Sequence, residues 1–269
     1  MSQSPLEMLP NDMLTEIAGW LPDQPPSDRK KLSPLSNFIG SSKRFYFLLQ
    51  PQHLLTQFLQ YVVYGNQKQA EAILKDPNLR SQLLEQKAQV IDYSGRIIYG
   101  TALQLALGAE DVKYHDDEEC MSEMLMGYLK QLANGEILIA QQIAEQFPEG
   151  WEEKEKARAQ RDLVALTQVV CAIENAQEGD NCDADIQVFR RYLDNENKSY
   201  VIKQGKHFNT QLLADTFNLY AEKYDQFGSD WDSPKNILFW RKIIGYIERY
   251  VPACYAQAFC QGVYSIVEE

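Results

Sequence analysis

Apolar residues recur at helical spacing through most of the chain, and proline or glycine interrupts that spacing at short intervals. The interruptions are Pro25 and Pro26, Gly65 and Asn66, Asp76 and Pro77, and Pro148 with Gly150. Because proline cannot continue a helix, these breaks limit the chain to short helices joined by turns. Alternation typical of a strand occurs only at residues 200–202. The pattern therefore predicts an all-α fold.

Residues 9–49 contain the most distinctive arrangement of these features. Leu9 and Pro10 open the segment, and Asn11 or Asp12 is placed to cap a helix. One apolar face of that helix, which Pro22 ends, is formed by Met13, Leu14, Ile17 and Leu21. Apolar positions resume downstream at Leu35, Phe38 and Ile39. A last apolar turn then follows Ser41, Ser42, Lys43, Arg44 and Phe45.

This order resembles an F-box: Leu-Pro, an acidic or amide residue, a Leu-x-x-Ile face, a second Leu-Pro, and a Ser-Lys-Arg-aromatic ending. The resemblance implies a three-helix unit over residues 1–50 that docks on a Skp-type adaptor of a cullin–RING ubiquitin ligase. It assigns the adaptor contact to Leu9, Pro10, Leu14, Ile17, Leu21, Leu35, Phe38 and Phe45. The loop at residues 23–33 is longer than is usual in that family, and Ser41 stands where an aliphatic residue is more common.

Residues 51–148 resemble degenerate ankyrin-like helical repeats. An apolar helix, a Gly-Asn turn and a second helix follow one another within residues 52–75. Residues 92–107 then carry an Asp-x-x-Gly turn and a Gly-Thr-Ala-Leu-x-Leu-Ala run, in which Thr101 is placed to cap a helix. Residues 114–120 interrupt the repeat before its partner helix. An independent solenoid needs about three repeats, so we expect these helix pairs to pack against the C-terminal helices as a cap.

Residues 149–269 are predicted to form a C-terminal helical bundle, with an irregular connection at residues 195–209. Helices are expected at 151–176, 186–194, 210–225, 234–249 and 252–267. The many aromatic residues of this region fall mostly at helical spacing and are expected in its core. Trp231, which lies between acidic residues in a loop, is the expected edge of a substrate-binding surface, and Tyr114 is a second candidate.

The formal net charge of -12 and the pI of about 4.8 argue against a general nucleic-acid or membrane-surface role, because phosphate backbones and anionic lipids repel an acidic chain. No apolar run approaches the roughly 20 residues that span a bilayer. The N-terminus also lacks the basic and apolar regions of a Sec-type signal peptide. We therefore expect a cytoplasmic protein, or one that reaches a host cytoplasm by another secretion route.

No motif for catalysis or for cofactor binding is visible. The histidines are far apart, the cysteines form no C-x-x-C pair, and the acidic runs at residues 116–119 and 180–185 lack the glycine and the distal Glu of a calcium loop. Neither a metal nor a cofactor is expected. Cys120 and Cys182 are the exposed thiols that a hidden cysteine-dependent enzyme would use.

Taken together, these features resemble the ankyrin-bearing F-box effectors that intracellular bacteria deliver into host cells. The resemblance implies a non-catalytic substrate receptor: residues 1–50 bind the adaptor, and the rest holds a target protein for ubiquitination. Two alternatives remain open. The chain is either an effector enzyme acting on a host protein, or a simple ankyrin-like scaffold with no link to ubiquitin.

Overall fold

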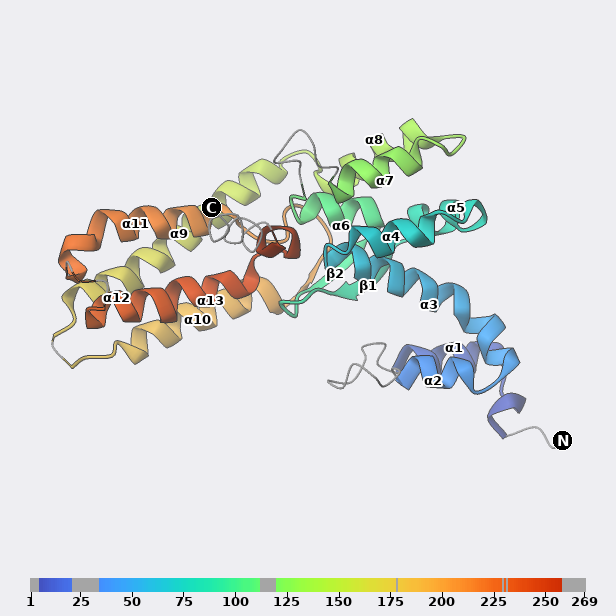
Figure 1. Ribbon diagram of the computed structural model, residues 1–269, viewed down its shortest axis with the longest axis horizontal. Coiled ribbons are helices and arrows are strands. Elements are labelled where there is room, and N and C mark those ends of the chain that lie inside the picture. The colour runs from blue at the N-terminus through green and yellow to red at the C-terminus, as the bar shows by residue number, and fades with distance from the viewer. Residues whose placement is uncertain are drawn as a thin grey trace, which may run out of the picture. The chain divides into compact units, whose positions relative to one another are not determined.

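The computed structural model describes residues 5–20, 34–111, 120–177, 179–228, 230 and 232–257. The described elements are almost all helical, which confirms the predicted all-α class, with one small three-stranded sheet in addition (Figure 1). The chain divides into two compact units, Met1–Phe58 and Leu59–Glu269. We call them unit 1 and unit 2.

Unit 1 contains a short 3-10 helix and three α-helices. They are η1 (Pro5–Met8), α1 (Asn11–Trp20), α2 (Pro34–Gly40) and the first part of α3 (Lys43–Val63). The start of α1 at Asn11 agrees with the predicted helix start after Pro10. The helix α3 passes through Pro51 and continues into unit 2.

Unit 2 begins with short helices that pack as neighbouring pairs. After the last turn of α3 come α4 (Gln67–Leu74), α5 (Pro77–Glu85), α6 (Ala102–Gly108), α7 (Met121–Leu129) and α8 (Gly135–Gln146). Thr101 caps α6 as predicted, because its hydroxyl accepts from the Gln104 N–H and the Gln104 side chain accepts from the Thr101 N–H. Helix α6 is buried over most of its length, since Ala102, Leu103, Leu105 and Ala106 are all removed from solvent.

A small sheet joins a hairpin between α5 and α6 to a short strand after α10 (Asp183–Lys198); the sequence predicted no hairpin, although it showed strand-like alternation at residues 200–202. Strands β1 (Ala88–Ile91) and β2 (Ile97–Gly100) form an antiparallel hairpin, and β3 (Val201–Ile202) pairs with β2 in parallel. Each strand buries only alternate residues of a short run, so the pattern is too brief to stand out. The predicted Asp-x-x-Gly turn is the hairpin turn itself, where Gly95 adopts a φ of +88°.

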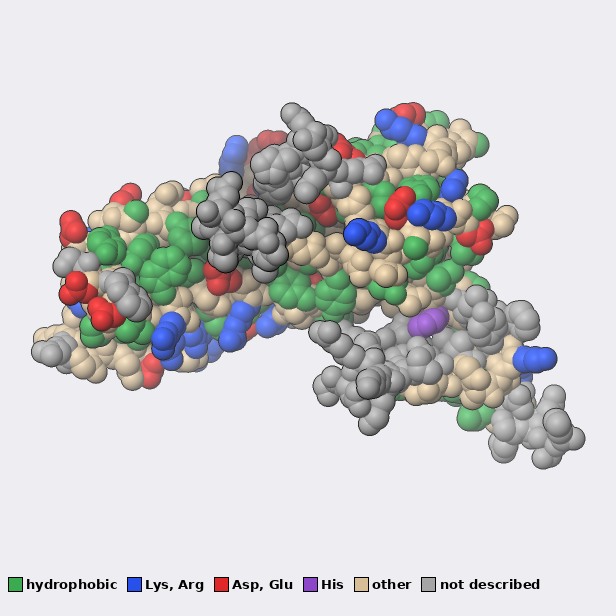
Figure 2. Space-filling view, in the orientation of Figure 1, with side chains coloured by type: hydrophobic (Ala, Val, Ile, Leu, Met, Phe, Trp, Pro, Cys, Tyr) green, Lys and Arg blue, Asp and Glu red, His purple; other side chains and the backbone are tan. Residues whose placement is uncertain are grey.

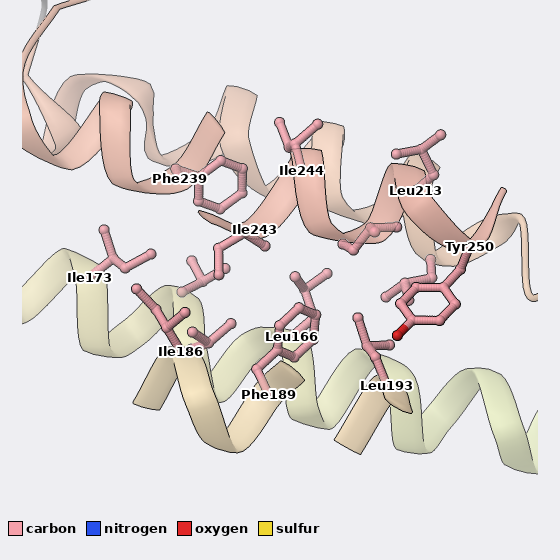
Figure 3. Close-up of a cluster of buried hydrophobic side chains, with 14 of the residues drawn as sticks. Leu166, Ile173, Ile186, Phe189, Leu193, Leu213, Phe239, Ile243, Ile244 and Tyr250 are labelled. Atoms are coloured by element: carbon pink, nitrogen blue, oxygen red, sulfur yellow. The ribbon is translucent and has the colours of Figure 1, made fainter. Parts of the chain in front are cut away.

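The remaining helices of unit 2 form the predicted bundle (Figure 1). They are α9 (Trp151–Asn175), α10 (Asp183–Lys198), α11 (Gln211–Phe227), α12 (Pro234–Leu238), the π-helix η2 (Phe239–Ile244), α13 (Gly245–Ile247) and the 3-10 turn η3 (Glu248–Tyr250). Figure 3 shows the core between α9, α10 and the segment from η2 to η3, where Leu166, Phe189 and Ile243 meet. The predicted helix at 186–194 is longer at both ends than expected, and residues 253–257 are helical.

Candidate adaptor-binding surface

The start of α1 is built by the Leu-Pro pair that opens the F-box-like segment. The Leu9 N–H donates to the Leu6 carbonyl at 3.2 Å, and the Leu14 N–H donates to the Pro10 carbonyl at 3.1 Å. Proline fits this place because it has no N–H to leave unpaired before the first helical turn. Pro10 itself is exposed, whereas Leu9 is half-buried.

Arg44 joins the two ends of the F-box-like motif. Its guanidinium donates to the Leu9 carbonyl at 2.8 Å and to Oδ1 of Asn11 at 2.6 Å. At the start of α3, the Ser42 hydroxyl accepts from the Arg44 N–H at 3.2 Å and so caps the helix. The Ser-Lys-Arg ending therefore has a structural role: it fixes the Leu-Pro entry of α1 against the start of α3.

Leu14 and Phe45, two of the predicted adaptor contacts, lie in the core of unit 1. Leu14 is 0% exposed and Phe45 is 2% exposed, and both pack with Ala18 and Leu49. The Phe38 ring stacks on Phe45 with 4.7 Å between ring centroids. These side chains hold the three helices together. In this arrangement the contact with a partner falls to other positions.

The apolar face of α1 extends beyond the core of unit 1 into solvent. Met13 is 46% exposed, and Ile17, one turn later, is half-buried. Met8 and Leu6 on the preceding 3-10 helix are 72% and 46% exposed. Together with Pro10, these four residues make a surface that we call the α1 apolar surface. Large apolar side chains gathered on so small a unit are typical of a protein-binding site.

The other predicted site residues are only partly described. The side chain of Leu35 in α2 lies outside the described residues, as do Leu21, Tyr114 and Trp231 entirely. Sequence reasoning did not assign Met8 or Leu6 to the site, because an F-box motif starts at Leu-Pro. The signal that could have found them is their apolar character immediately before that pair.

A buried cluster of charged groups in unit 2 is the arrangement closest to an active site. Arg96, which is 0% exposed, forms an ion pair with Asp92 at 2.7 Å and donates to the His207 carbonyl at 3.2 Å. The same carboxylate accepts from the N–H groups of Ser94 and Arg96. Burial, together with the positive charges of Arg96 and Arg158, lowers the pKa of His207 to about 3.

Neighbouring polar groups complete this cluster with further bonds inside the unit. The Asp162 carboxylate accepts from the Tyr192 hydroxyl at 2.6 Å and from the Asn209 amide at 2.7 Å. Burial and the hydrogen bond to Asp162 raise the pKa of Tyr192 above its ordinary value. Each carboxylate is thus occupied by several donors and removed from solvent. The arrangement fixes the segment at residues 203–210 between the short helices and the bundle.

Neither of the two thiols expected at the surface is fully exposed. Cys182, predicted to be exposed, is buried, because it lies in a left-handed turn at the start of α10 and its side chain packs into the bundle core. Burial raises the pKa of its thiol, and Cys120 is half-buried. Within the described ranges, no group of His, Cys, Asp and Glu is arranged to hold a metal ion.

Comparison with family models, with curated proteins and with solved structures gives no match to this chain. Among the described helices, none combines the length and the apolar character needed to cross a membrane.

Proposed function

We propose that the chain is a substrate receptor of the F-box type, in which the α1 apolar surface docks on a Skp-type adaptor. The observation that carries the proposal is the width of the apolar face of α1, because the unit's own core covers only one side of that face. Leu14 and Ala18 are buried in the core of unit 1, whereas Met13 on the same face is 46% exposed and Ile17 is half-buried. An apolar face that extends beyond the core is supported when a partner covers its exposed edge.

The motif residues divide into two groups under this proposal. Leu14, Phe38 and Phe45 keep the helices in place, and Arg44 keeps the Leu9–Pro10 entry in register. The adaptor then contacts Leu6, Met8, Pro10, Met13 and Ile17. Full burial of a Met or Ile side chain contributes roughly 1.5–3 kcal/mol, so a few such residues account for binding in the micromolar range.

Unit 2 is the part that would hold the target protein. A receptor of this kind needs no acid, base or nucleophile of its own, because it acts by holding the target near the ubiquitin-charged enzyme of a cullin–RING ligase. The setting that goes with this proposal is the cytoplasm of a host cell, reached by a secretion route other than Sec. The cytoplasm of the cell that makes the protein is the alternative setting.

The test is calorimetric titration of the full chain with a purified recombinant Skp-type adaptor. Met13→Glu places a charge in the α1 apolar surface and should weaken binding by at least roughly tenfold. Thr15→Glu, an exposed position on another side of the same helix, is the matched control and should change affinity less than about twofold. A Leu9→Ala/Pro10→Ala double variant should also lose binding, because it removes the Leu9 side chain that packs on the core of unit 1 and the exposed Pro10 ring of the α1 apolar surface.

Failure of the unmodified chain to bind the adaptor would overturn the receptor proposal. The chain would then be an interaction scaffold, and the α1 apolar surface would serve some other protein. Equal loss of binding in Met13→Glu and Thr15→Glu would argue that the contact lies elsewhere on unit 1.

A further inference from the structure

Unit 2 carries a row of basic side chains along α10 and the segment from η2 to η3. Figure 2 shows Lys and Arg gathered along this edge of the bundle, on a chain whose net charge is -12. We call this row, extended past β3, the cationic track. It consists of Arg190, Lys198, Lys203, Lys242 and Arg249.

Tyrosine rings support the cations of the track. The Arg190 guanidinium carbon lies 4.7 Å from the ring centroid of Tyr246, and that of Arg249 lies 5.4 Å from the same ring. The next ring along, Tyr250, lies 5.8 Å from Tyr246 and carries Lys198 at 5.0 Å. Stacking on an aromatic face attracts a cation and restricts its movement. The track therefore presents its charges in fixed positions.

Asp194 fixes the rings of Tyr246 and Tyr250 through their hydroxyl groups. Its carboxylate accepts from the Tyr246 hydroxyl at 2.8 Å and from the Tyr250 hydroxyl. It also pairs with Lys198 at 3.4 Å. This carboxylate is thus used mainly to hold the tyrosines, and its charge offsets one of the cations.

The other track cations on the bundle lack an acidic partner among the described residues. No carboxylate in the described part of the chain pairs with Arg190, Lys242 or Arg249. Arg190 donates to the Lys242 carbonyl at 3.2 Å, yet its buried Nε has no hydrogen-bond partner. Guanidinium groups are the usual recognition elements for carboxylate and phosphate. The track can therefore take an anionic partner from another molecule.

Exposed apolar side chains continue the track across the sheet. A Cβ placed on Gly95 of the hairpin turn would lie 3.7 Å from Cε of Lys198, so the turn sits beside that cation. On the outer face of the sheet, Lys203 lies 5.9 Å from the Tyr99 ring. Tyr99 and Ile91, on the same face, are 38% and 39% exposed. Basic and apolar groups therefore lie next to each other along one surface.

We propose that the cationic track and the outer face of the sheet form a docking site for an acidic peptide segment that also carries apolar residues. Charge complementarity selects the acidic residues, and the side chains around Tyr99 select the apolar ones. A long nucleic acid fits less well, because it would bring many phosphates against an otherwise acidic protein. The site stands on unit 2 alone, so it does not depend on adaptor binding by unit 1.

The test measures fluorescence anisotropy of a labelled peptide made of Glu-Glu-Leu-Phe repeats, titrated with the full chain. Lys203→Glu/Arg249→Glu reverses two exposed charges of the track and should weaken binding by at least roughly tenfold. Lys154→Glu/Lys156→Glu reverses two exposed charges on the first turns of α9 and should weaken it less than about threefold. Equal thermal stability of the two double variants shows that both are folded.

Two further probes define the site. A peptide with Gln in place of Glu and one with Ser in place of Leu and Phe should each bind more weakly than the parent peptide. Absence of binding by the parent peptide, or an equal loss in both double variants, would overturn the proposal. Tighter binding of labelled oligothymidylate than of the peptide, lost in the track variant, would show that the track serves nucleic acid instead.

Discussion

The two units differ in the size of their cores and in the charged residues that they bury. Unit 1 has a small core around Leu14 and Phe45 and leaves Met8 and Met13 in solvent. Unit 2 has a long continuous core in its bundle, and it also buries charged side chains such as Arg96 and Asp162. Both units expose some apolar side chains, but among the described residues only unit 2 buries charged ones.

Size accounts for the difference. A short segment buries a small fraction of its apolar surface, so a partner that covers the remainder adds much to its stability. A large unit has enough apolar burial to tolerate a buried ion pair, whose net contribution to stability is small but whose geometry is specific. Under the receptor proposal, the exposed apolar residues of unit 1 form the contact with the adaptor, whereas the buried charges of unit 2 have a structural role.

The largest effect is expected from Arg96→Met in unit 2. The change leaves the Asp92 carboxylate buried without its cation, and the free energy of unfolding should fall by about 3–5 kcal/mol in a urea titration. Arg161→Met is the matched control, since Arg161 pairs with Glu196 while its side chain is 54% exposed. That variant should lose less than about 1 kcal/mol. Equal losses would show that the buried pair is no more important than a surface one.

Leu14→Ala should destabilise unit 1 by roughly 3 kcal/mol, because it leaves a cavity at a fully buried position. Hydrogen exchange should show loss of amide protection over residues 11–20 and 34–49, with no change over residues 151–227. Leu6→Ala, at a position 46% exposed, should leave the exchange pattern unchanged. Loss of protection throughout both units would contradict their independence.

Acidification should weaken unit 2 through His207. Its folded pKa of about 3 lies below the ordinary value of 6.5, so the unfolded chain binds the proton more readily. The stability that the neutral imidazole allows is complete above pH 6.5 and is lost as the pH falls toward 3, by up to about 1.4 kcal/mol per pH unit. In thermal melts across this range, His207→Gln should flatten the dependence. An unchanged slope in that variant would exclude His207 as its source.

The smallest effect is expected from Ser42→Ala, which removes the cap of α3. Loss of this hydrogen bond should lower the stability of unit 1 by about 1 kcal/mol, as measured by hydrogen exchange of the same amides. Thr15→Ala also removes a hydroxyl, but one that bonds the Asn11 carbonyl within α1. Because alanine favours a helix, that variant should be neutral or slightly more stable.

Much of the helical architecture follows from local patterns that the sequence displays. The start of α1 after Pro10, the cap at Thr101 and the break at Pro148 were predicted from residue types alone. The missed hairpin shows the limit of such patterns. Val90 and Ile98 are its buried residues, and they become a recognisable pair only when the turn brings β1 and β2 together.

The direction that a helix faces was harder to predict. In α8 the apolar side chains of Ile137 and Ile143 are 68% and 37% exposed. The buried side consists of Ile139 with Gln142 and Gln146, whose amides bond to backbone carbonyls of Leu84 and Gly205. Polarity alone cannot identify the inner face when the core itself supplies hydrogen-bond partners.

By itself, the sequence determined the helical class, most helix starts and the resemblance of residues 9–49 to an F-box, because caps, prolines and apolar spacing act within a few residues. Only the tertiary structure decided that Leu14 and Phe45 are core while Met8 and Met13 are surface, that Arg44 holds Leu9, and that distant tyrosines support the cations of α10. These outcomes depend on contacts between residues far apart in the chain, and no local pattern encodes which side of a helix its neighbours will cover.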